Sequence, residues 1–192
     1  MKTYFQRLLK ILEHSLMSLD DEKFTELIDD CEATVRSGGK IITSGLGKNV
    51  PVCEKFVGTM NSLGMASAFM NTNSATHGDI GIVKSNDLVI LLTKSGETTE
   101  SIYLYHLLKK RNCKIWLLTF RAESTLSKLI DNVILVDLEH EGDMWNIVPN
   151  NSTTLNLILL QTLSIRLSKR MEITLEEFKN NHPGGYIGEI LK

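Results

Sequence analysis

The spacing of hydrophobic residues changes near residue 38 of the chain. Before that point, apolar side chains recur every three or four positions, which is typical of amphipathic helices. The first helix carries them at Phe5, Leu8, Leu9, Ile11, Leu12 and Leu16, and the second at Phe24, Leu27, Ile28, Cys31 and Val35. Asp20 or Asp21 can cap the second helix, and Gly38-Gly39 ends it. We therefore predict two N-terminal helices in residues 1–37, followed by a catalytic α/β core in residues 38–192.

After residue 38, short apolar runs alternate with helical patterns. The apolar runs predict strands over 40–45, 66–71, 86–93, 114–119 and 132–138, and the helical patterns predict helices over 49–64, 98–112, 124–131, 151–170 and 175–181. This alternation indicates a parallel sheet with helices on both faces. We expect a three-layer α/β/α sandwich with a five-stranded parallel sheet in the flavodoxin-like order. Ligands of such sheets bind beyond the carboxyl ends of the strands.

The composition narrows the classes of protein to consider. The 192 residues are 42% hydrophobic and 23% charged, with a formal net charge of -2, which fits one globular domain. This balance gives no electrostatic reason to expect nucleic acid as a partner. We expect no membrane partner, because no apolar run approaches the roughly 20 residues of a span, and charges interrupt the N-terminus where a signal peptide would be apolar. Three cysteines without a CxxC pattern indicate reduced thiols in a cytoplasmic protein.

The first predicted strand ends in the sequence SGLGKN, over residues 44–49. Gly47 lets the backbone approach a ligand closely, the following helix N-terminus favours an anion, and Lys48 adds a positive charge. The motif is neither a Walker A loop nor a full GxGxxG fingerprint. A phosphate-binding loop and a tight turn with a solvated lysine are therefore both consistent with this segment.

Hydroxyl side chains gather where the third predicted strand gives way to a helix. In the sequence TKSGETTE, Gly96 is surrounded by Thr93, Ser95, Thr98 and Thr99. Hydroxyl groups and the free N–H groups of a helix N-terminus together form a suitable cradle for phosphate. Serine and threonine are also ordinary N-caps, but four hydroxyls exceed what capping needs. We therefore favour a phosphate site over plain capping here.

The loop after the fifth predicted strand contains four titratable side chains: Glu139, His140, Glu141 and Asp143. A long helix follows, and Asn151 or Ser152 can cap it. A carboxylate at this end of the sheet can serve as a general base, although a solvated acidic loop would have the same composition. The spacing of the four side chains singles out no metal.

Two histidines lie in turns that contain glycine. His77 belongs to an HGD turn between the second and third strands, and His182 belongs to the sequence NHPGG near the C-terminus. Pro183 removes a backbone N–H, and the two glycines after it permit unusual dihedral angles. Each histidine ring has two possible roles. It is an exposed side chain in a loop or at a helix end, or it belongs to a functional site.

Taken in order, the segments GLGKN, THGDIG, KSGETTE, STT after a proline, and NHPGG resemble the SIS (sugar isomerase) domain family. The combination of HGD with HPGG is similar to the arabinose-5-phosphate isomerases of Kdo synthesis, and the resemblance extends from about residue 39 to residue 191. It implies a five-stranded sheet between helices, assembled as a homotetramer. It also implies an isomerase that interconverts D-ribulose 5-phosphate and D-arabinose 5-phosphate through an enediol, supplying Kdo for lipopolysaccharide or capsule.

The resemblance implies a small-molecule sugar phosphate as the ligand, with no cofactor and no metal. Most members carry a pair of CBS domains after the SIS domain, whereas we expect a single SIS domain over residues 1–192. The family's phosphate loop falls on Thr93, Ser95 and Thr98, and we expect Gly47 to contribute to the same site.

The same resemblance implies the catalytic positions. The family's lysine after the first strand falls on Lys48, and its catalytic carboxylates fall on Glu100 and Glu141. Its catalytic histidine falls on His182, and the HGD histidine, often contributed to a neighbouring subunit's site, falls on His77. Which of the two carboxylates takes the carbon-bound proton stays open.

Three positions depart from the usual motifs of this family. Asn49 stands where a serine usually follows the Gly-Lys pair, and the usual NSGES is KSGET here, which puts Lys94 in the loop. Around Glu141, the sequence HEGDMWNIVPN replaces KEACPLGLAPT and preserves only the glutamate and the proline.

Two other functions share these motifs. One is a phosphosugar isomerase for hexulose or heptose phosphates, and the other is a non-catalytic SIS domain that binds a phosphosugar and regulates a partner. We favour an enzyme because the chain retains candidate acid–base residues that a sensor need not keep.

The isomerase hypothesis gives the NHPGG tail a testable role. We expect the tail to fold over a strand-end pocket, either its own or a neighbour's, and to deliver His182 to the sugar. Truncation after Lys179 should then abolish turnover while the core sheet stays folded, as measured by an isomerase assay and circular dichroism. Activity that survives the truncation would make NHPGG an ordinary helix stop.

Overall fold

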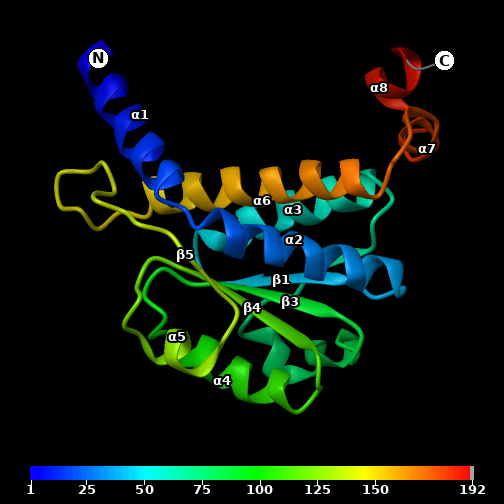
Figure 1. Cartoon of the computed structure of the whole chain (residues 1–192), viewed down its shortest axis with the longest axis horizontal. Helices are drawn as coiled ribbons and strands as arrows, with labels where there is room; N and C mark the ends of the chain where they lie inside the picture. Colours follow the sequence, from blue (N-terminus) through cyan, green and yellow to red (C-terminus); the bar gives the residue numbers. More distant parts are fainter. Residues whose placement is uncertain (191–192) are drawn as a thin grey trace.

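The protein, seen here in a computed structural model that describes residues 1–190, is built on a five-stranded parallel sheet (Figure 1). The strands are β1 (Ile41–Gly45), β2 (Ser67–Phe69), β3 (Leu88–Leu92), β4 (Lys114–Thr119) and β5 (Val133–Leu135). Their order across the sheet is β2-β1-β3-β4-β5, with every neighbouring pair parallel. The predicted five-stranded parallel sheet and its flavodoxin-like order are confirmed.

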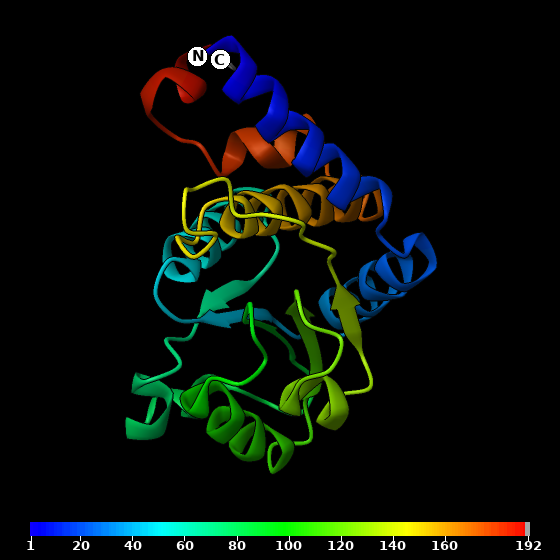
Figure 2. The ribbon, with the colours of Figure 1, turned by 90° about the vertical axis from the view of Figure 1, so that its left-hand side faces the viewer.

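Helices cover both faces of the sheet, which gives the three layers expected from the sequence (Figures 1 and 2). One face is covered by α2 (Asp21–Arg36), α3 (Asn49–Ser62) and α6 (Asn151–Arg170), and α1 (Lys2–Met17) packs against α6. The other face is covered by α4 (Thr99–Lys109) and α5 (Thr125–Leu129). The short turns η1 (Ser74–His77) and η2 (Asp79–Ile82) join β2 to β3, and α7 (Leu175–Asn180) and α8 (Gly185–Ile190) form the tail.

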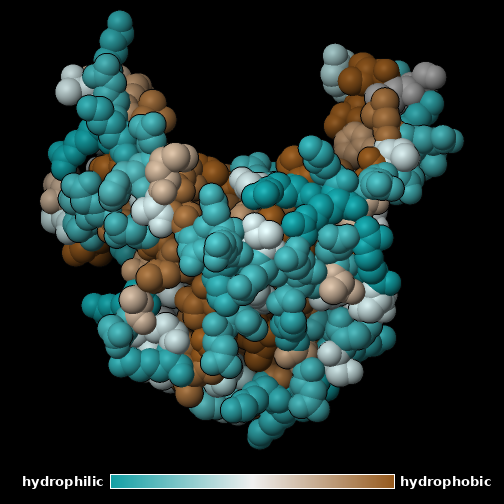
Figure 3. Space-filling view, in the orientation of Figure 1, coloured by the Kyte–Doolittle hydropathy of each residue, from teal (hydrophilic) through white to brown (hydrophobic). Residues whose placement is uncertain are grey.

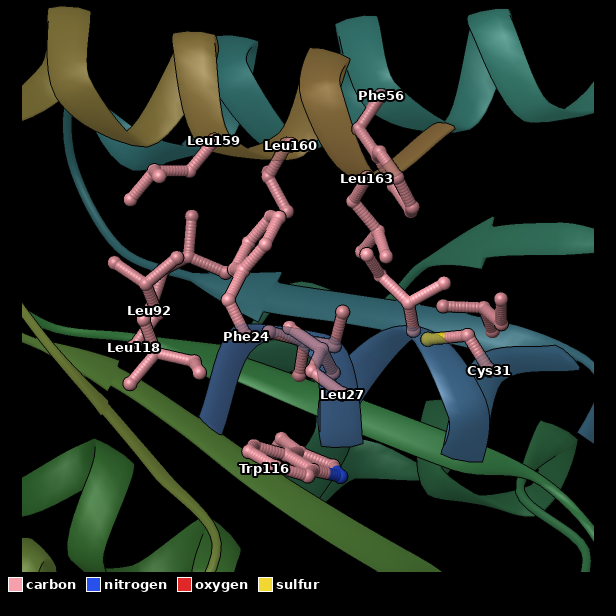
Figure 4. Packing of buried hydrophobic residues seen from close by; sticks show 14 of the residues in the cluster. Phe24, Leu27, Cys31, Phe56, Leu92, Trp116, Leu118, Leu159, Leu160 and Leu163 are labelled. Carbon is pink, nitrogen blue, oxygen red and sulfur yellow. The ribbon is translucent and has the colours of Figure 1, made fainter. Parts of the chain in front are cut away.

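The central strands read as continuous apolar runs because both of their faces are buried. In β3, Leu88, Ile90 and Leu92 join the core beneath α2, α3 and α6, whereas Val89 and Leu91 join the core on the α4 and α5 side. Successive strand side chains point to opposite faces, so one run of five residues fills two cores. Figure 4 shows the first of these cores, where side chains from α6, α3 and α2 meet those of the sheet.

α2 is capped by its own N-cap residue, whereas α6 is capped by a residue from outside the helix. Asp20, rather than Asp21, caps α2, because its carboxylate accepts a hydrogen bond of 2.9 Å from the backbone N–H of Lys23. The expectation that Asn151 or Ser152 caps α6 is wrong, since the N-cap position is Asn150 and its side chain makes no capping bond. The N–H groups at the start of α6 are bound instead by Glu141, a residue outside the helix.

Two ends of the chain project from the same side of the molecule, beyond α6 (Figures 1 and 3). The outer turns of α1 expose Tyr4, Phe5 and Leu9, and the tail exposes Leu175, Tyr186, Ile187 and Ile190. Apolar side chains on projecting segments are typical of surfaces that pack against another protein. Among residues 1–190, no helix has both the length and the apolar character needed to cross a membrane.

A buried ion pair ties together the starts of β1 and β3. The Asp87 carboxylate accepts hydrogen bonds of 2.8 Å from the backbone N–H of Lys40, the ammonium of Lys40 and the backbone N–H of Lys84. Burial alone would raise the pKa of Asp87, but the hydrogen bonds from Lys40 and Lys84 outweigh it and hold the pKa below its usual range. This pair therefore fixes the register in which the two central strands begin.

Replacing Asp87 should destabilise the protein substantially. An Asp87→Ala variant leaves the Lys40 ammonium and two backbone N–H groups without their acceptor, which should lower the free energy of unfolding by about 2–4 kcal/mol. Urea unfolding followed by circular dichroism measures the change. The exposed Asp131 provides a matched control, and Asp131→Ala should change the stability by less than about 0.5 kcal/mol. Equal effects of the two substitutions would contradict the role given to Asp87.

Candidate active site

A cavity of about 380 Å³ opens at the carboxyl ends of β1 and β3. Three segments form its walls: the loop from β1 into α3, the loop from β3 into α4, and the start of α6. Its polar lining comes from Lys48, Asn49, Thr93, Lys94, Ser95, Thr98, Ser101, Ser152, Thr153 and Asn156. The structure thus brings together Gly47, Lys48, Thr93, Ser95 and Thr98 from the two loops that the sequence singled out. Thr99, the fourth hydroxyl residue expected around Gly96, lies outside this cavity.

The loop after β1 presents a helix N-terminus to the cavity. Gly47 adopts a φ of +57°, in the region that favours glycine, and the turn it makes leads directly into α3. Lys48 occupies the N-cap position of α3 without a capping side-chain bond, and its side chain is exposed. The first N–H groups of α3 and the Lys48 ammonium therefore place positive charge at this wall.

The loop after β3 presents a second uncapped N-terminus. Thr98 is the N-cap residue of α4, and its hydroxyl makes no capping bond. The Thr93 hydroxyl accepts from the N–H of Gly96 (3.3 Å), and the Ser95 hydroxyl accepts from the N–H of Glu97 (3.2 Å). Because each hydroxyl also has a hydrogen to donate, these bonds orient the oxygens while leaving the O–H groups able to bind an anion.

Gly96 is required by the packing of this loop. Its φ is +65°, and a Cβ at this position would lie 2.1 Å from the Oγ of Ser124. The neighbouring Glu97 binds the backbone N–H and the hydroxyl of Thr125 at 2.8 and 2.7 Å, which ties the loop to α5. The loop after β3 is therefore tied to the start of α5.

Glu141 does not line the cavity, and its side chain is 0% exposed. Its Oε1 accepts from the Ser152 hydroxyl (2.7 Å) and pairs with the Lys94 ammonium (2.6 Å). Its Oε2 accepts from the backbone N–H groups of Asn150 (3.0 Å) and Ser152 (2.9 Å). Four donors thus surround the carboxylate, which caps α6 from outside the helix.

The pKa of Glu141 reflects two opposing effects. Burial raises the pKa, because a charged carboxylate loses its hydration. Hydrogen bonds from Lys94, Ser152 and Asn150 favour the ionised form and outweigh burial, so they hold the pKa below its usual range. The carboxylate is therefore ionised at neutral pH in this arrangement.

Two other titratable side chains of this loop, those of Asp143 and His140, bind its backbone. Asp143 accepts from the backbone N–H groups of Trp145, Ile147 and Val148 at 2.8, 3.0 and 3.0 Å, which closes the turn that leads to Pro149 at the rim of the cavity. His140 accepts at Nδ1 from the N–H of Gly142 (2.9 Å), and Glu139 is exposed. In residues 1–190, no three His, Cys, Asp or Glu side chains come together as a set of metal ligands.

His77 and Glu100 do not line this cavity but share a second depression of about 450 Å³. His77 ends η1, Glu100 lies in the first turn of α4, and both side chains are exposed. The two hollows lie on either side of the start of α4, since Thr98 lines the first and Thr99 the second.

His182 lies at the opposite end of the molecule from the cavity. The Asn181 side chain donates to the carbonyl of Ser62, the last residue of α3, whereas the first residue of α3 lines the cavity. A helix of this length spans about 20 Å, so the tail does not cover the pocket of its own chain. The expectation that the tail folds over the strand-end pocket of its own chain is therefore wrong. The His182 ring bonds the carbonyl of Phe178 through Nδ1 (2.7 Å) and packs on the Phe178 ring.

Sequence reasoning missed two polar residues of α6 as members of the site. Ser152 binds Glu141, and Asn156 donates to the Asn49 side chain (2.9 Å) while its own Oδ1 is buried without a partner in the described residues. Residues four apart lie on one face of a helix. Their shared helix face at the start of α6, beside the candidate site, is a signal that could have identified them.

Loss of the Glu141 charge should destabilise the protein in a pH-dependent way. Glu141→Gln should lower the free energy of unfolding at pH 7 by about 1–3 kcal/mol, because the Lys94 ammonium loses its partner. A lowered folded-state pKa contributes stability that is complete above the unfolded value of about 4.3 and is lost as pH falls through the folded value. The difference between variant and wild type should therefore shrink below about pH 4, as measured by urea unfolding.

The exposed Glu139 in the same loop gives a matched control for this measurement. Glu139→Gln should show little difference from the wild type at any pH. A Glu141→Gln difference that stays constant between pH 7 and pH 3 would show that the charge of this carboxylate does not stabilise the fold.

Comparison with known proteins places this site in a family. A family model described as the SIS domain matches residues 35–166. The arabinose 5-phosphate isomerase KdsD of Yersinia pestis is 30% identical over 186 residues, covering 97% of this chain and 57% of that protein. An uncharacterized protein of Helicobacter pylori is 36% identical over 170 residues, covering 85% of this chain and 52% of that protein. The chain thus spans about half the length of these relatives.

Solved structures support the same assignment. A proposed phosphosugar isomerase involved in capsule formation from Bacteroides fragilis superposes with a TM-score of 0.87 and 29% identity, covering 95% of this chain and 97% of the other. The Escherichia coli CFT073 protein c3406, solved in complex with arabinose 5-phosphate, gives a TM-score of 0.87 and 29% identity, with 95% of each chain covered. Together with the family model, these likenesses show that the chain belongs to the SIS domain family.

Proposed function

We propose that the chain is a sugar-phosphate isomerase that interconverts D-ribulose 5-phosphate and D-arabinose 5-phosphate. The observation that carries the proposal is the cavity at the carboxyl ends of β1 and β3, where two uncapped helix N-termini, six hydroxyl side chains and Lys48 converge. The relatives named arabinose 5-phosphate isomerase and the relative solved with arabinose 5-phosphate support this choice of substrate. The product would serve Kdo supply for lipopolysaccharide or capsule.

The phosphate group is assigned to the loop after β3. Thr93, Ser95 and Thr98 would donate hydroxyl hydrogens to it, and the free N–H groups of α4 would add the positive end of the helix dipole. Gly47 lets the opposite loop approach the same group. Binding energy from the phosphate, which is remote from the reacting carbons, then holds the sugar in place for the chemical step.

Isomerisation moves one proton between the first two carbons of the open-chain sugar. In the direction from the ketose, a base removes a proton from C1 and the carbonyl oxygen on C2 gains one, which gives the enediol. Return of a proton to C2 and loss of the proton on the C1 oxygen give the aldose. Lys48 is assigned to the developing charge on the oxygens. A carboxylate, Glu100 or Glu141, is assigned to the carbon-bound proton. His182 is assigned to the oxygens or to ring opening, because an imidazole can both accept and donate a proton.

The distribution of these residues supports a site shared between subunits. His182 lies about 20 Å from the cavity of its own chain, at the far end of α3. The projecting segments α1 and α8 expose apolar side chains that a neighbouring subunit could cover. We therefore propose a homotetramer in which a neighbour supplies His182, and in which His77 reaches an adjacent site from its exposed turn.

The experiment that tests the function is incubation of the purified chain with D-ribulose 5-phosphate in heavy water. D-arabinose 5-phosphate carrying deuterium on C2 should form, because the enediol takes its proton from the enzyme or solvent. His182→Ala should lower kcat/KM by about 10²- to 10⁴-fold. The exposed His106 on α4 provides the control, and His106→Ala should retain wild-type activity.

Mixing two inactive variants tests the shared site. Refolded mixtures of His182→Ala and Glu100→Gln subunits should regain part of the activity, because some sites then draw an intact residue from each chain. Turnover of six- or seven-carbon sugar phosphates in place of the pentose would reassign the substrate. Binding of sugar phosphates without any turnover would identify a sensor instead.

A further inference from the structure

Lys94 is a positive charge in the phosphate loop that the proposed function leaves unused. It lies between Thr93 and Ser95 and lines the same cavity as both. Its ammonium is 2.6 Å from Oε1 of Glu141, and its side chain is 44% exposed. The residue thus connects the buried carboxylate to the open space of the cavity.

The ammonium has donors left for a ligand. A lysine ammonium carries three N–H groups, and among residues 1–190 the Lys94 ammonium makes one ion pair, to Glu141. The remaining N–H groups belong to a side chain that solvent reaches. Lys94 can therefore donate to an anion in the cavity without leaving Glu141.

Lys94 is only one of the groups that hold Glu141 in place. Three of its four donors belong to the first turn of α6 and to the residue before it: the N–H of Asn150, and the N–H and hydroxyl of Ser152. The positive end of the helix dipole favours the carboxylate at the same place. Because Glu141 is fixed by α6, it fixes the ammonium in turn, and a lysine that is already ordered loses less conformational entropy when it binds a ligand.

Building on the phosphate site of the proposed function, we propose that Lys94 is the cationic side-chain contact for the substrate's phosphoryl group, and that Glu141 is the positioning residue that holds it there. With Glu141 buried among four donors, the carbon-bound proton is then left to Glu100. The phosphoryl group is the chosen partner because Lys94 is flanked on both sides by hydroxyl residues of the phosphate loop. A compact ammonium is also a common phosphate ligand. Lys48, on the opposite wall, is left for the oxygens of the sugar.

Removing the Lys94 charge should weaken phosphate binding specifically. Inorganic phosphate and D-arabinose 5-phosphate are titrated by calorimetry into wild type, Lys94→Asn and Lys94→Arg at pH 7.5. Lys94→Asn should weaken the binding of both by about 10- to 100-fold, which is the range for a lost charged hydrogen bond. KM should rise by a similar factor with kcat little changed, and Lys94→Arg should restore part of the affinity. Lys128→Asn, which removes a lysine from an exposed pair with Glu123, should change nothing.

Glu141→Gln tests whether Glu141 positions Lys94 or is only a nearby negative charge. The two explanations predict opposite changes in phosphate affinity. If Glu141 were only a nearby negative charge, its removal would strengthen phosphate binding. If it positions Lys94, its removal should weaken phosphate binding, and the Lys94→Asn/Glu141→Gln double variant should bind no more weakly than Lys94→Asn alone. Unfolding curves for each variant confirm that the protein measured is folded.

The outcomes separate this proposal from the isomerase. Unchanged phosphate affinity in a folded Lys94→Asn variant overturns the role of Lys94, even if the wild type isomerises the pentose phosphate. An equal loss of affinity for unphosphorylated D-arabinose also overturns it, because the lysine would then contact the sugar. If the wild type shows no turnover but binds phosphate, and Lys94→Asn weakens that binding, this inference is supported. Only the isomerase function is then rejected.

Discussion

A single buried carboxylate joins two of the three walls of the candidate site. Glu141, from the loop after β5, binds the first turn of α6 and pairs with Lys94 in the loop after β3. Burying an unpaired charge costs several kcal/mol, so this arrangement persists only because four donors and a helix N-terminus offset that cost. As a result, the cavity wall made by α6 and the wall made by the loop after β3 are fixed relative to each other.

The strand order explains why the cavity forms between β1 and β3. The chain passes from β1 to β2 on one side of β1, whereas β3 lies on its other side. The connections that leave β1 and β3 therefore run to opposite faces of the sheet, toward α3 and toward α4, and a crevice opens between them. Both helices begin at that crevice without a capping side chain, in contrast to α6, whose start is bound by Glu141. The fold thus leaves two positive helix ends open where an anion can bind.

The strands, and the loops that line the cavity, were accessible from the sequence because their signals are local. Hydrophobic period predicted the strands, and glycine turns and clustered hydroxyls pointed to the residues around Gly47 and Ser95. The strand order is not a local signal, and it was chosen as a common order for five parallel strands. The cap of α6 was not accessible, because its carboxylate lies nine residues before the N-cap and reaches it only through the folded loop. The distance of His182 from the cavity could not be predicted from the sequence either. Its motif indicates a turn, but only the packing of Asn181 on the end of α3 shows how far the ring is from the cavity.

The separation of His182 from its own cavity has a consequence for how activity would depend on the amount of protein. If the ring serves a neighbour, a single chain has a binding cavity but no complete set of proton-transfer groups. Catalytic competence would then follow mass action, so specific activity would fall on dilution even though every chain stayed folded. In that case subunit association would act as a concentration threshold, and a cell making little of this protein would make almost no enzyme.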